Sequence, residues 1–258
     1  MRKNRSDEIM EIKSVAVLGA GAVGSYVIWG LSGVKNIELG VVAEGERAKR
    51  LKEKGCTINH TVYHPHVWTP QEAHGVDLLV VSLKYGALPG ALESIREAVG
   101  ENTIVMSLMN GVDSEEMIST VIPKANIMYS LIKVASHKEE DGYCFDPETT
   151  IGIIFGELEA PYESERVRAI EELFADTGLH FRHTDYIREE MWSKFSKSIS
   201  SCCLCNFCHD FQPPTVILPI SQFPVYLHGS EVFLLQIQHP VRTAVTRRWC
   251  FQIRFRLM

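Results

Sequence analysis

Short apolar runs alternate with amphipathic segments along the first three quarters of the chain. The apolar runs have the length and composition of strands that are buried on both faces of a sheet. They lie at residues 14–18, 37–43, 77–83, 103–108 and 126–135. Amphipathic or apolar segments that predict helices lie between them, at residues 25–31, 46–54 and 89–99. A strand–helix–strand order of this kind predicts an α/β protein with a Rossmann-type, doubly wound parallel sheet.

The pattern continues beyond residue 135 with shorter segments. We expect a hairpin or irregular stretch at residues 57–67, and two segments, Tyr143–Phe145 and residues 150–155, that extend the sheet. Residues 161–177 predict an amphipathic helix that ends at Gly178, followed by a short strand at residues 180–183 and a helix that opens at Ile187. Asp113 precedes another predicted helix and has the side chain of an N-cap.

A glycine-rich turn joins the first predicted strand to the first predicted helix. Gly-x-Gly-x-x-Gly in this position is the fingerprint of dinucleotide binding, because glycines permit the tight turn and the approach of a pyrophosphate to the backbone. The helix N-terminus would add unpaired N–H groups and a positive dipole end. A glycine turn that serves only packing is the alternative. The predicted cofactor-binding residues of this turn are Gly19, Ala20, Gly21, Ala22, Val23 and Gly24.

The end of the second predicted strand carries residues that bear on the choice of cofactor. In a Rossmann unit an acid here binds the ribose 2′-hydroxyl of NAD, whereas an arginine accepts the 2′-phosphate of NADP. Glu44 stands at this point and Arg47 follows closely. The sequence therefore leaves NADP(H) and NAD(H) both open, and a solvated helix face is the alternative for the basic residues around Arg47.

Two polar residues follow the next two predicted strands. Lys84 comes after the run at 77–83, and Asn110 comes after the run at 103–108. Ligands of open α/β sheets bind at the carboxyl ends of the strands, so both side chains are predicted to face the ligand crevice. For Asn110, which precedes Gly111, a simple turn is the alternative.

Composition sets the class of protein and separates the C-terminal part from the rest. The chain has 258 residues with a net charge of -6, and its N-terminus lacks the apolar core of a signal peptide. It contains no apolar run of about 18 residues, so we expect a cytoplasmic protein without a membrane or nucleic-acid partner. Residues 1–195 are acidic, whereas residues 196–258 carry six Lys or Arg against two acids.

The C-terminal part also holds five of the seven cysteines and five of the eleven prolines. The prolines exclude a long helix there. Its cysteines and His209 are dense enough to attract zinc or an iron–sulfur cluster, but they lack the paired spacing of a structural zinc site, so no metal is expected. These cysteines are Cys202, Cys203, Cys205, Cys208 and Cys250.

Four motifs in unbroken order resemble the ketopantoate reductase (2-dehydropantoate 2-reductase) family. They are GAGAVG at 19–24, SLKYGALPGAL at 82–92, SLMNGVDSEE at 107–116 and EEMWSKF at 189–195. The resemblance implies an oxidoreductase that reduces ketopantoate to pantoate with NADPH, on the route to pantothenate. It also implies a small 2-keto acid substrate, and it leaves a homodimer open.

The resemblance assigns roles to three residues. Lys194 matches the general acid, Asn110 matches the asparagine that binds the reacting keto oxygen, and Lys84 matches a lysine along the cofactor and substrate crevice. An ammonium can stabilise and then protonate the oxygen on which charge develops, while an amide fixes its position. Without the resemblance, Lys194 would be interpreted as a surface lysine of an amphipathic helix.

The sequence departs from the family after Phe195. Members continue there with a helical substrate domain, which the C-terminal residues do not match, and Ser198 stands where an asparagine is usual. We therefore expect an N-terminal extension at 1–11, a Rossmann domain at 12–184, and a truncated or frame-shifted remnant of the helical domain at 185–258. A change of reading frame near codons 195–200 is one hypothesis, and impaired catalysis, or a non-catalytic dinucleotide-binding remnant, is the expected consequence.

Overall fold

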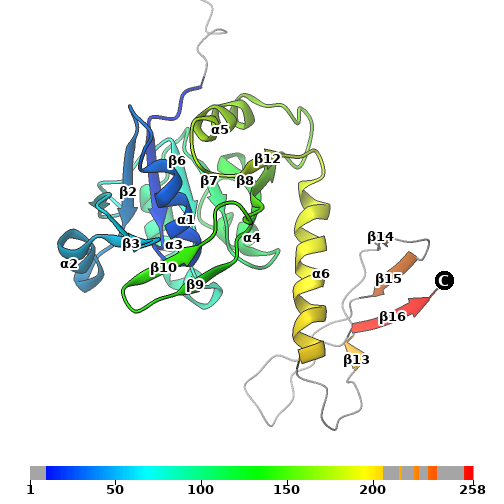
Figure 1. Ribbon diagram of the computed structural model, residues 1–258. Helices are drawn as coiled ribbons and strands as arrows, with labels where there is room; N and C mark the ends of the chain where they lie inside the picture. Colours follow the sequence, from blue (N-terminus) through cyan, green and yellow to red (C-terminus); the bar gives the residue numbers. More distant parts are fainter. Residues whose placement is uncertain (1–9, 206–214, 217–223, 227–231, 237–252, 258) are drawn as a thin grey trace, which may run out of the picture. The chain divides into compact units, whose positions relative to one another are not determined.

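The computed structural model describes residues 10–205, 215–216, 224–226, 232–236 and 253–257. The chain divides into two compact units, Met1–Phe195 and Ser196–Met258. Most of the expected strands and helices lie in the first unit (Figure 1).

An eight-stranded sheet forms the centre of the first unit. Its order is β12 (Phe181–His183), β11 (Gly152–Gly156), β8 (Ile127–Lys133), β7 (Ile104–Ser107), β6 (Leu78–Val81), β1 (Ser14–Leu18), β2 (Glu38–Val42) and β5 (His66–Trp68). Neighbouring strands from β8 to β5 are parallel, while β11 is antiparallel to β8 and parallel to β12. Because β1 lies between β2 and β6, the chain reverses its direction of winding there, which is where ligands of such sheets bind.

Helices cover both faces of this sheet because successive strand residues point to opposite sides. Val15 and Val17 of β1 share a core with α1 (Ala22–Leu31) and α5 (Glu165–Ala175). Ala16 and Leu18 share the opposite core with α3 (Leu88–Ala98) and α4 (Ser114–Ile118). The α/β, Rossmann-type, doubly wound fold class is therefore confirmed.

A second, four-stranded sheet corrects one expectation. Its order is β4 (Thr61–Tyr63), β3 (Cys56–Ile58), β10 (Gly142–Phe145) and β9 (Ser136–Lys138). The segment Tyr143–Phe145 was expected to extend the main sheet, but it pairs with β3 and β9 instead. The hairpin expected at residues 57–67 is the β3–β4 pair. Short strands give no periodic signal that tells which of two sheets they will join.

Two helix boundaries and one helix cap differ from the expected ones. Helix α5 begins at Glu165 rather than at residue 161, because the Ser164 side chain caps it by accepting from the Val167 N–H at 3.2 Å. Asp113 lies at the N-cap position of α4, but its side chain makes no capping bond. Helix α6 (Ile187–Cys205) continues beyond residue 196, where the composition had suggested that helical structure stops.

The remaining elements are α2 (Gly45–Lys54), two short 3₁₀ turns, η1 (Tyr85–Ala87) and η2 (Lys124–Asn126), and the strands of the second unit. Those strands form a sheet in the order β13 (Thr215–Val216), β16 (Ile253–Leu257), β15 (Val232–Gln236) and β14 (Pro224–Tyr226). Among the described residues, no helix combines the length and the apolar character needed to cross a membrane.

Candidate active site

The glycine turn joins β1 to α1 at the centre of the main sheet. Gly19 has a φ of 109°, which favours glycine, and a Cβ there would lie 2.8 Å from the Ser82 carbonyl oxygen. A Cβ on Gly24 would lie 2.0 Å from the Gly19 carbonyl oxygen. These two glycines are therefore required by the packing of the turn itself.

Gly21 differs, because a Cβ there would meet no atom within 4 Å. Gly21 is the N-cap of α1, with extended backbone and no capping side chain. The N–H groups of Ala22, Val23 and Gly24 belong to the first turn of α1, where no carbonyl of the helix can accept from them. The space beside Gly21 and these donors fit a pyrophosphate, for which the bare backbone and the helix dipole are suited.

Hydrogen bonds link the loops at the carboxyl ends of β1, β6 and β7. The Ser82 hydroxyl, just after β6, donates to the Gly19 carbonyl at 2.7 Å. The Tyr85 hydroxyl donates to Asp113 Oδ2 at 2.5 Å, which joins the loop after β6 to the loop after β7. Ser82 and Tyr85 belong to a family motif, but neither bond could be predicted from the sequence, because a partner 28 or more residues away leaves no local signal. These bonds connect three loops, residues 19–21, 82–85 and 110–113, which together are called the rim. Lys84 and Asn110 belong to it.

Lys194 and Asn110 come together at this rim although 84 residues separate them. The Lys194 ammonium donates to Asn110 Oδ1 at 2.9 Å. Asn110 follows β7 and is exposed, while Lys194 is half-buried on α6. Since Asn110 Oδ1 accepts from the lysine, its amide N–H₂ remains the group that can donate to a ligand oxygen.

Burial and a neighbouring positive charge set the pKa of Lys194. Burial, and the positive charge of Lys133 next, lower the pKa of Lys194 below its ordinary value. Lys133 lies 3.4 Å from Glu190, which also pairs with Arg182. Although burial opposes its ionisation, Arg182 and Lys133 hold the pKa of Glu190 below its ordinary value. A lysine whose pKa is lowered in this way gives up its proton more readily near neutral pH.

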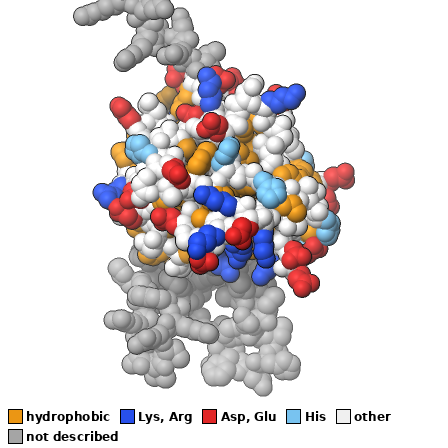
Figure 2. Space-filling model, turned by 90° about the vertical axis from the view of Figure 1, so that its left-hand side faces the viewer, with side chains coloured by type: hydrophobic (Ala, Val, Ile, Leu, Met, Phe, Trp, Pro, Cys, Tyr) orange, Lys and Arg blue, Asp and Glu red, His pale blue; other side chains and the backbone are white. Residues whose placement is uncertain are grey.

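The residues predicted to choose the cofactor lie at the expected place in the fold. Glu44 follows β2 as the N-cap of α2, without a capping side-chain bond, and Arg47 lies in the first turn. Both are exposed, as is Lys84 after β6. Figure 2 shows this side of the molecule, where Lys and Arg side chains gather next to Asp and Glu. An anion or a ribose hydroxyl could therefore be bound at this helix start.

A buried carboxyl group that no sequence motif indicated lies on α4, which follows the loop that carries Asn110. Glu115 of α4 is 1% exposed. Its Oε2 accepts from the Ser114 hydroxyl at 2.8 Å, whereas its Oε1 has no hydrogen-bond partner within the described chain. Burial raises its pKa to about 7. Acidic residues are common in the first turn of a helix, where they interact favourably with the helix dipole, so this position alone does not indicate burial.

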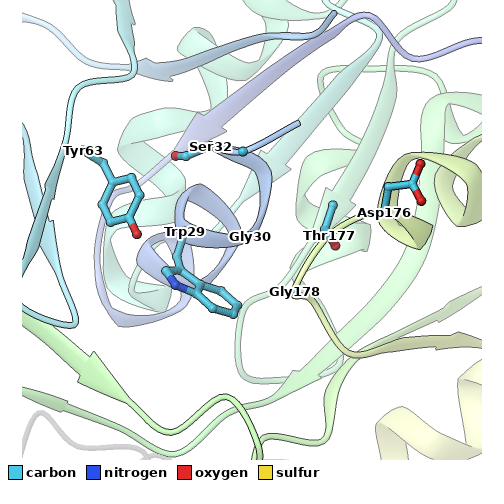
Figure 3. Close-up of a pocket in the computed structure, with 8 residues that line it drawn as sticks. Trp29, Gly30, Ser32, Tyr63, Asp176, Thr177 and Gly178 are labelled. Atoms are coloured by element: carbon cyan, nitrogen blue, oxygen red, sulfur yellow. The ribbon is translucent and has the colours of Figure 1, made fainter. Parts of the chain in front are cut away.

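A hollow of about 390 Å³ lies at the other end of α1. Figure 3 shows Tyr63 on one side of it and Thr177 and Gly178 on the other, with Trp29 between them. None of the predicted site residues lines it. Because it lies at the C-terminal end of α1, this helix presents carbonyl groups to it rather than free N–H groups, which does not favour an anionic cofactor.

The cysteine-rich C-terminal part lies largely outside the described residues. Side chains of residues 198–205 and residues 206–214 lie outside the described part of the chain, as does Cys250. The prediction of no metal at these cysteines therefore stays a prediction.

A doubly wound sheet with a glycine turn at its switch point defines the class of Rossmann-type dinucleotide-binding folds. The sequence profile of the family described as ketopantoate reductase PanE/ApbA matches residues 15–154, more than half of the chain. The chain belongs to this family, which confirms the resemblance found in the four motifs.

Curated relatives agree with this assignment. The chain is 23% identical over 183 residues to the "Uncharacterized oxidoreductase YkpB" of Bacillus subtilis (strain 168), covering 69% of this chain and 60% of that protein. It is 22% identical over 200 residues to the 2-dehydropantoate 2-reductase of Streptococcus pyogenes serotype M1, covering 75% of this chain and 64% of that protein. The chain thus spans a little under two thirds of the length of these relatives.

Solved structures share the fold. The 2-dehydropantoate 2-reductase of Porphyromonas gingivalis W83 matches with a TM-score of 0.66 at 20% identity, over 77% of this chain and 74% of that one. A D-mandelate dehydrogenase solved with NADH and anilino(oxo)acetate matches with a TM-score of 0.58 at 20% identity, over 70% and 60%. A dimeric ketopantoate reductase from Staphylococcus aureus matches with a TM-score of 0.55 at 17% identity, over 75% and 68%.

Proposed function

We propose that this protein is a 2-keto acid reductase that reduces 2-dehydropantoate to pantoate with NADPH, in pantothenate biosynthesis. The observation that carries the proposal is the hydrogen bond from the Lys194 ammonium to Asn110 Oδ1. It unites the two residues to which the family resemblance assigns the chemistry. Membership of the family supports the reaction type.

In the proposed mechanism, Lys194 is the general acid and Asn110 orients the substrate. A bound nicotinamide cofactor would supply the hydride. The Asn110 amide N–H₂ donates to the keto oxygen and fixes its position, and the Lys194 ammonium stabilises the charge that develops on that oxygen. Lys194 then gives its proton to the oxygen, a transfer that its lowered pKa favours.

The rim of the main sheet would hold the cofactor. The pyrophosphate would be held by the turn of Gly19, Ala20 and Gly21 and by the N–H groups of Ala22, Val23 and Gly24. Lys84 would lie along the crevice. Arg47 would accept the 2′-phosphate of NADPH, whereas Glu44 would favour the 2′-hydroxyl of NADH. NADH is the alternative cofactor, because a D-mandelate dehydrogenase with a similar fold was solved with NADH.

The departure of residues 196–258 from the family pattern bears on catalysis. We assign residues 12–184 to the Rossmann domain and residues 185–258 to a remnant of the substrate domain. In a two-domain reductase the substrate lies between the domains, so residues 196–258, which do not match the family pattern, would change the substrate contacts. A non-catalytic dinucleotide-binding protein is therefore the second candidate function.

Titration of the full chain with NADPH and with NADH tests the cofactor site. Quenching of the four tryptophans reports binding. We expect saturable binding, with Glu44→Ala shifting the preference toward NADPH by removing a charge that repels the 2′-phosphate. Loss of all binding would contradict both candidate functions.

NADPH oxidation that depends on 2-dehydropantoate then separates the two candidates. Turnover supports the reductase, and binding without turnover supports the non-catalytic alternative. Turnover as fast as that of a full-length family member would contradict the expected impairment.

The remaining expectations follow from the family. We propose a small-molecule 2-keto acid as the substrate and the cytoplasm as the location. A homodimer is proposed because the Staphylococcus aureus relative is described as dimeric. Light scattering coupled to size-exclusion chromatography measures the assembly, and a monomeric mass at all concentrations would contradict the dimer.

A further inference from the structure

Metal-ligating side chains gather on the small sheet, away from the residues assigned to reduction. They are His60 in the β3–β4 turn, His137 of β9, Glu139 just after β9, and Cys144 of β10. None of them belongs to the four family motifs. The proposed reductase reaction uses none of them.

Three of these groups are close enough to share one cation. One donor atom from each of His60, Glu139 and Cys144 lies within 4.8 Å of the other two. His60 Nε2 lies 3.9 Å from Cys144 Sγ, and His60 Nδ1 lies 3.5 Å from Glu139 Oε2. A cation at their centre would need only small side-chain rotations, because two of the three side chains are at least partly exposed.

His137 lies on the same side of the sheet. It is paired directly with Cys144 in the antiparallel β9–β10 ladder, so the two side chains share a face. His137 Nε2 lies 3.5 Å from Glu139 Oε1. His137 is therefore the candidate fourth donor, because it lies next to Glu139 and opposite Cys144.

The backbone holds His60 over Cys144 in an unusual conformation. Asn59 and His60 have φ values of 47° and 63°, the left-handed region that non-glycine residues rarely adopt. Asn59 fixes this turn to β10 twice: its N–H donates to the Tyr143 carbonyl at 3.0 Å, and its Oδ1 accepts from the Phe145 N–H at 2.9 Å. The turn that presents His60 is thus docked on the strand that presents Cys144.

We propose that His60, Glu139 and Cys144, with His137 as the fourth ligand, form a binding site for a divalent metal ion of the zinc class. A thiolate, two imidazoles and a carboxylate are the donors that Zn²⁺ accepts, usually in tetrahedral geometry. The sulfur donor disfavours Mg²⁺ and Ca²⁺, which prefer oxygen ligands. The metal would join the β3–β4 hairpin to the β9–β10 hairpin, which is a structural role.

The C-terminal cysteines would confuse a simple metal measurement, so the test removes them. A full-length background variant carries serine at residues 202, 203, 205, 208 and 250, which leaves Cys56 and Cys144 as its cysteines. Cobalt(II) is the probe, because a thiolate ligand produces a charge-transfer band that imidazole and carboxylate ligands do not. Zn²⁺ titration by calorimetry gives the stoichiometry and affinity.

Cys56 provides a matched control for Cys144. Both lie on the small sheet and both are 8% exposed, but only Cys144 faces the histidine and glutamate. In the background variant we expect one Zn²⁺ per chain and a thiolate–cobalt band. Cys144→Ser is expected to abolish the band and weaken Zn²⁺ binding by more than the roughly 10–100-fold cost of changing a second-shell partner. Cys56→Ser should leave both unchanged.

A second variant guards against loss of folding. His60→Asn removes a ligand but keeps a residue that tolerates positive φ. It should weaken Zn²⁺ binding while the circular dichroism spectrum of the unliganded protein stays the same. Zn²⁺ should raise the Tm of the background variant but not that of His60→Asn, since a ligand stabilises only the state that binds it.

Three results would overturn the proposal. They are metal binding that disappears in the background variant, binding that survives both Cys144→Ser and His60→Asn, and a cobalt spectrum without a thiolate band. The first result would place the metal at the C-terminal cysteines. Either of the other two results would mean that His60, Glu139 and Cys144 form only hydrogen bonds and ion pairs.

Discussion

The two sheets of the first unit position their polar groups in different ways. In the eight-stranded sheet, the candidate reductase residues follow the carboxyl ends of β1, β6 and β7, so parallel pairing brings Gly21, Lys84 and Asn110 to one edge. In the four-stranded sheet, the candidate metal ligands lie on hairpins, and their positions depend on one turn, Asn59–His60, docked on β10. The first arrangement depends on topology and the second on a few side-chain and turn contacts.

The largest effect is expected where α6 meets the main sheet. Lys194→Ala removes the proposed general acid and should lower the rate of 2-dehydropantoate reduction by about 10²–10⁴-fold. NADPH binding, measured by tryptophan quenching, should change little. Lys197→Ala, an exposed lysine on the same helix, is the control and should keep the activity. Equal loss in both variants would contradict the role of Lys194.

The buried carboxyl group of Glu115 should make the stability of the main sheet depend on pH. Its pKa is about 7 in the folded protein and near the ordinary 4.5 when unfolded, so the folded state holds the proton more tightly. The contribution of Glu115 to the free energy of unfolding is therefore greatest below about pH 4.5. This contribution falls by about 3 kcal/mol as the pH rises to about 7.

Glu115→Gln should remove this dependence. Urea unfolding at about pH 5 and about pH 8 measures it, and the difference between the two midpoints should shrink in the variant. Glu116→Gln on the neighbouring position is the control. A midpoint difference that is the same in wild type and Glu115→Gln would contradict the raised pKa.

The glycine turn offers a paired test of packing against ligand binding. Gly24→Ala forces a Cβ against the Gly19 carbonyl and should destabilise the fold by about 2 kcal/mol. The Cβ of Gly21→Ala meets no protein atom within 4 Å. The free energy of unfolding should therefore stay within about 1 kcal/mol of the wild-type value, while the affinity for NADPH falls. Chemical denaturation and tryptophan quenching separate the two effects. Unchanged NADPH affinity in Gly21→Ala would mean that the space beside Gly21 does not hold the pyrophosphate.

The smallest effect is expected at the turn of the small sheet. Asn59→Ala loses the hydrogen bond to Phe145 and places alanine at positive φ, which should cost of the order of 1–2 kcal/mol. Asn59→Gly keeps the conformation and loses only the side-chain bond, so it should cost less. If the two variants are equally stable, backbone conformation is not what limits this turn.

The sequence by itself determined the fold class, the family and the glycine turn. These depend on local patterns: apolar runs of strand length, Gly19, Gly21 and Gly24 between a strand and a helix, and four motifs in order. It also predicted that Lys84 and Asn110 follow strand ends, because parallel strands share an edge. Helix ends were less accurate, as α5 and α6 show, since Ser164 and the residues after Phe195 give weak boundary signals.

Only the tertiary structure decided which distant side chains meet. The Lys194–Asn110 bond joins residues 84 positions apart, the Tyr85–Asp113 bond joins residues 28 positions apart, and the metal-ligand cluster brings His60 to Glu139 and Cys144. It also decided that Tyr143–Phe145 leaves the main sheet and that Glu115 is buried with a raised pKa. The physical reason is that hydrophobic periodicity is a property of neighbours in the chain, whereas desolvation, charge pairing and metal-ligand geometry are properties of neighbours in space.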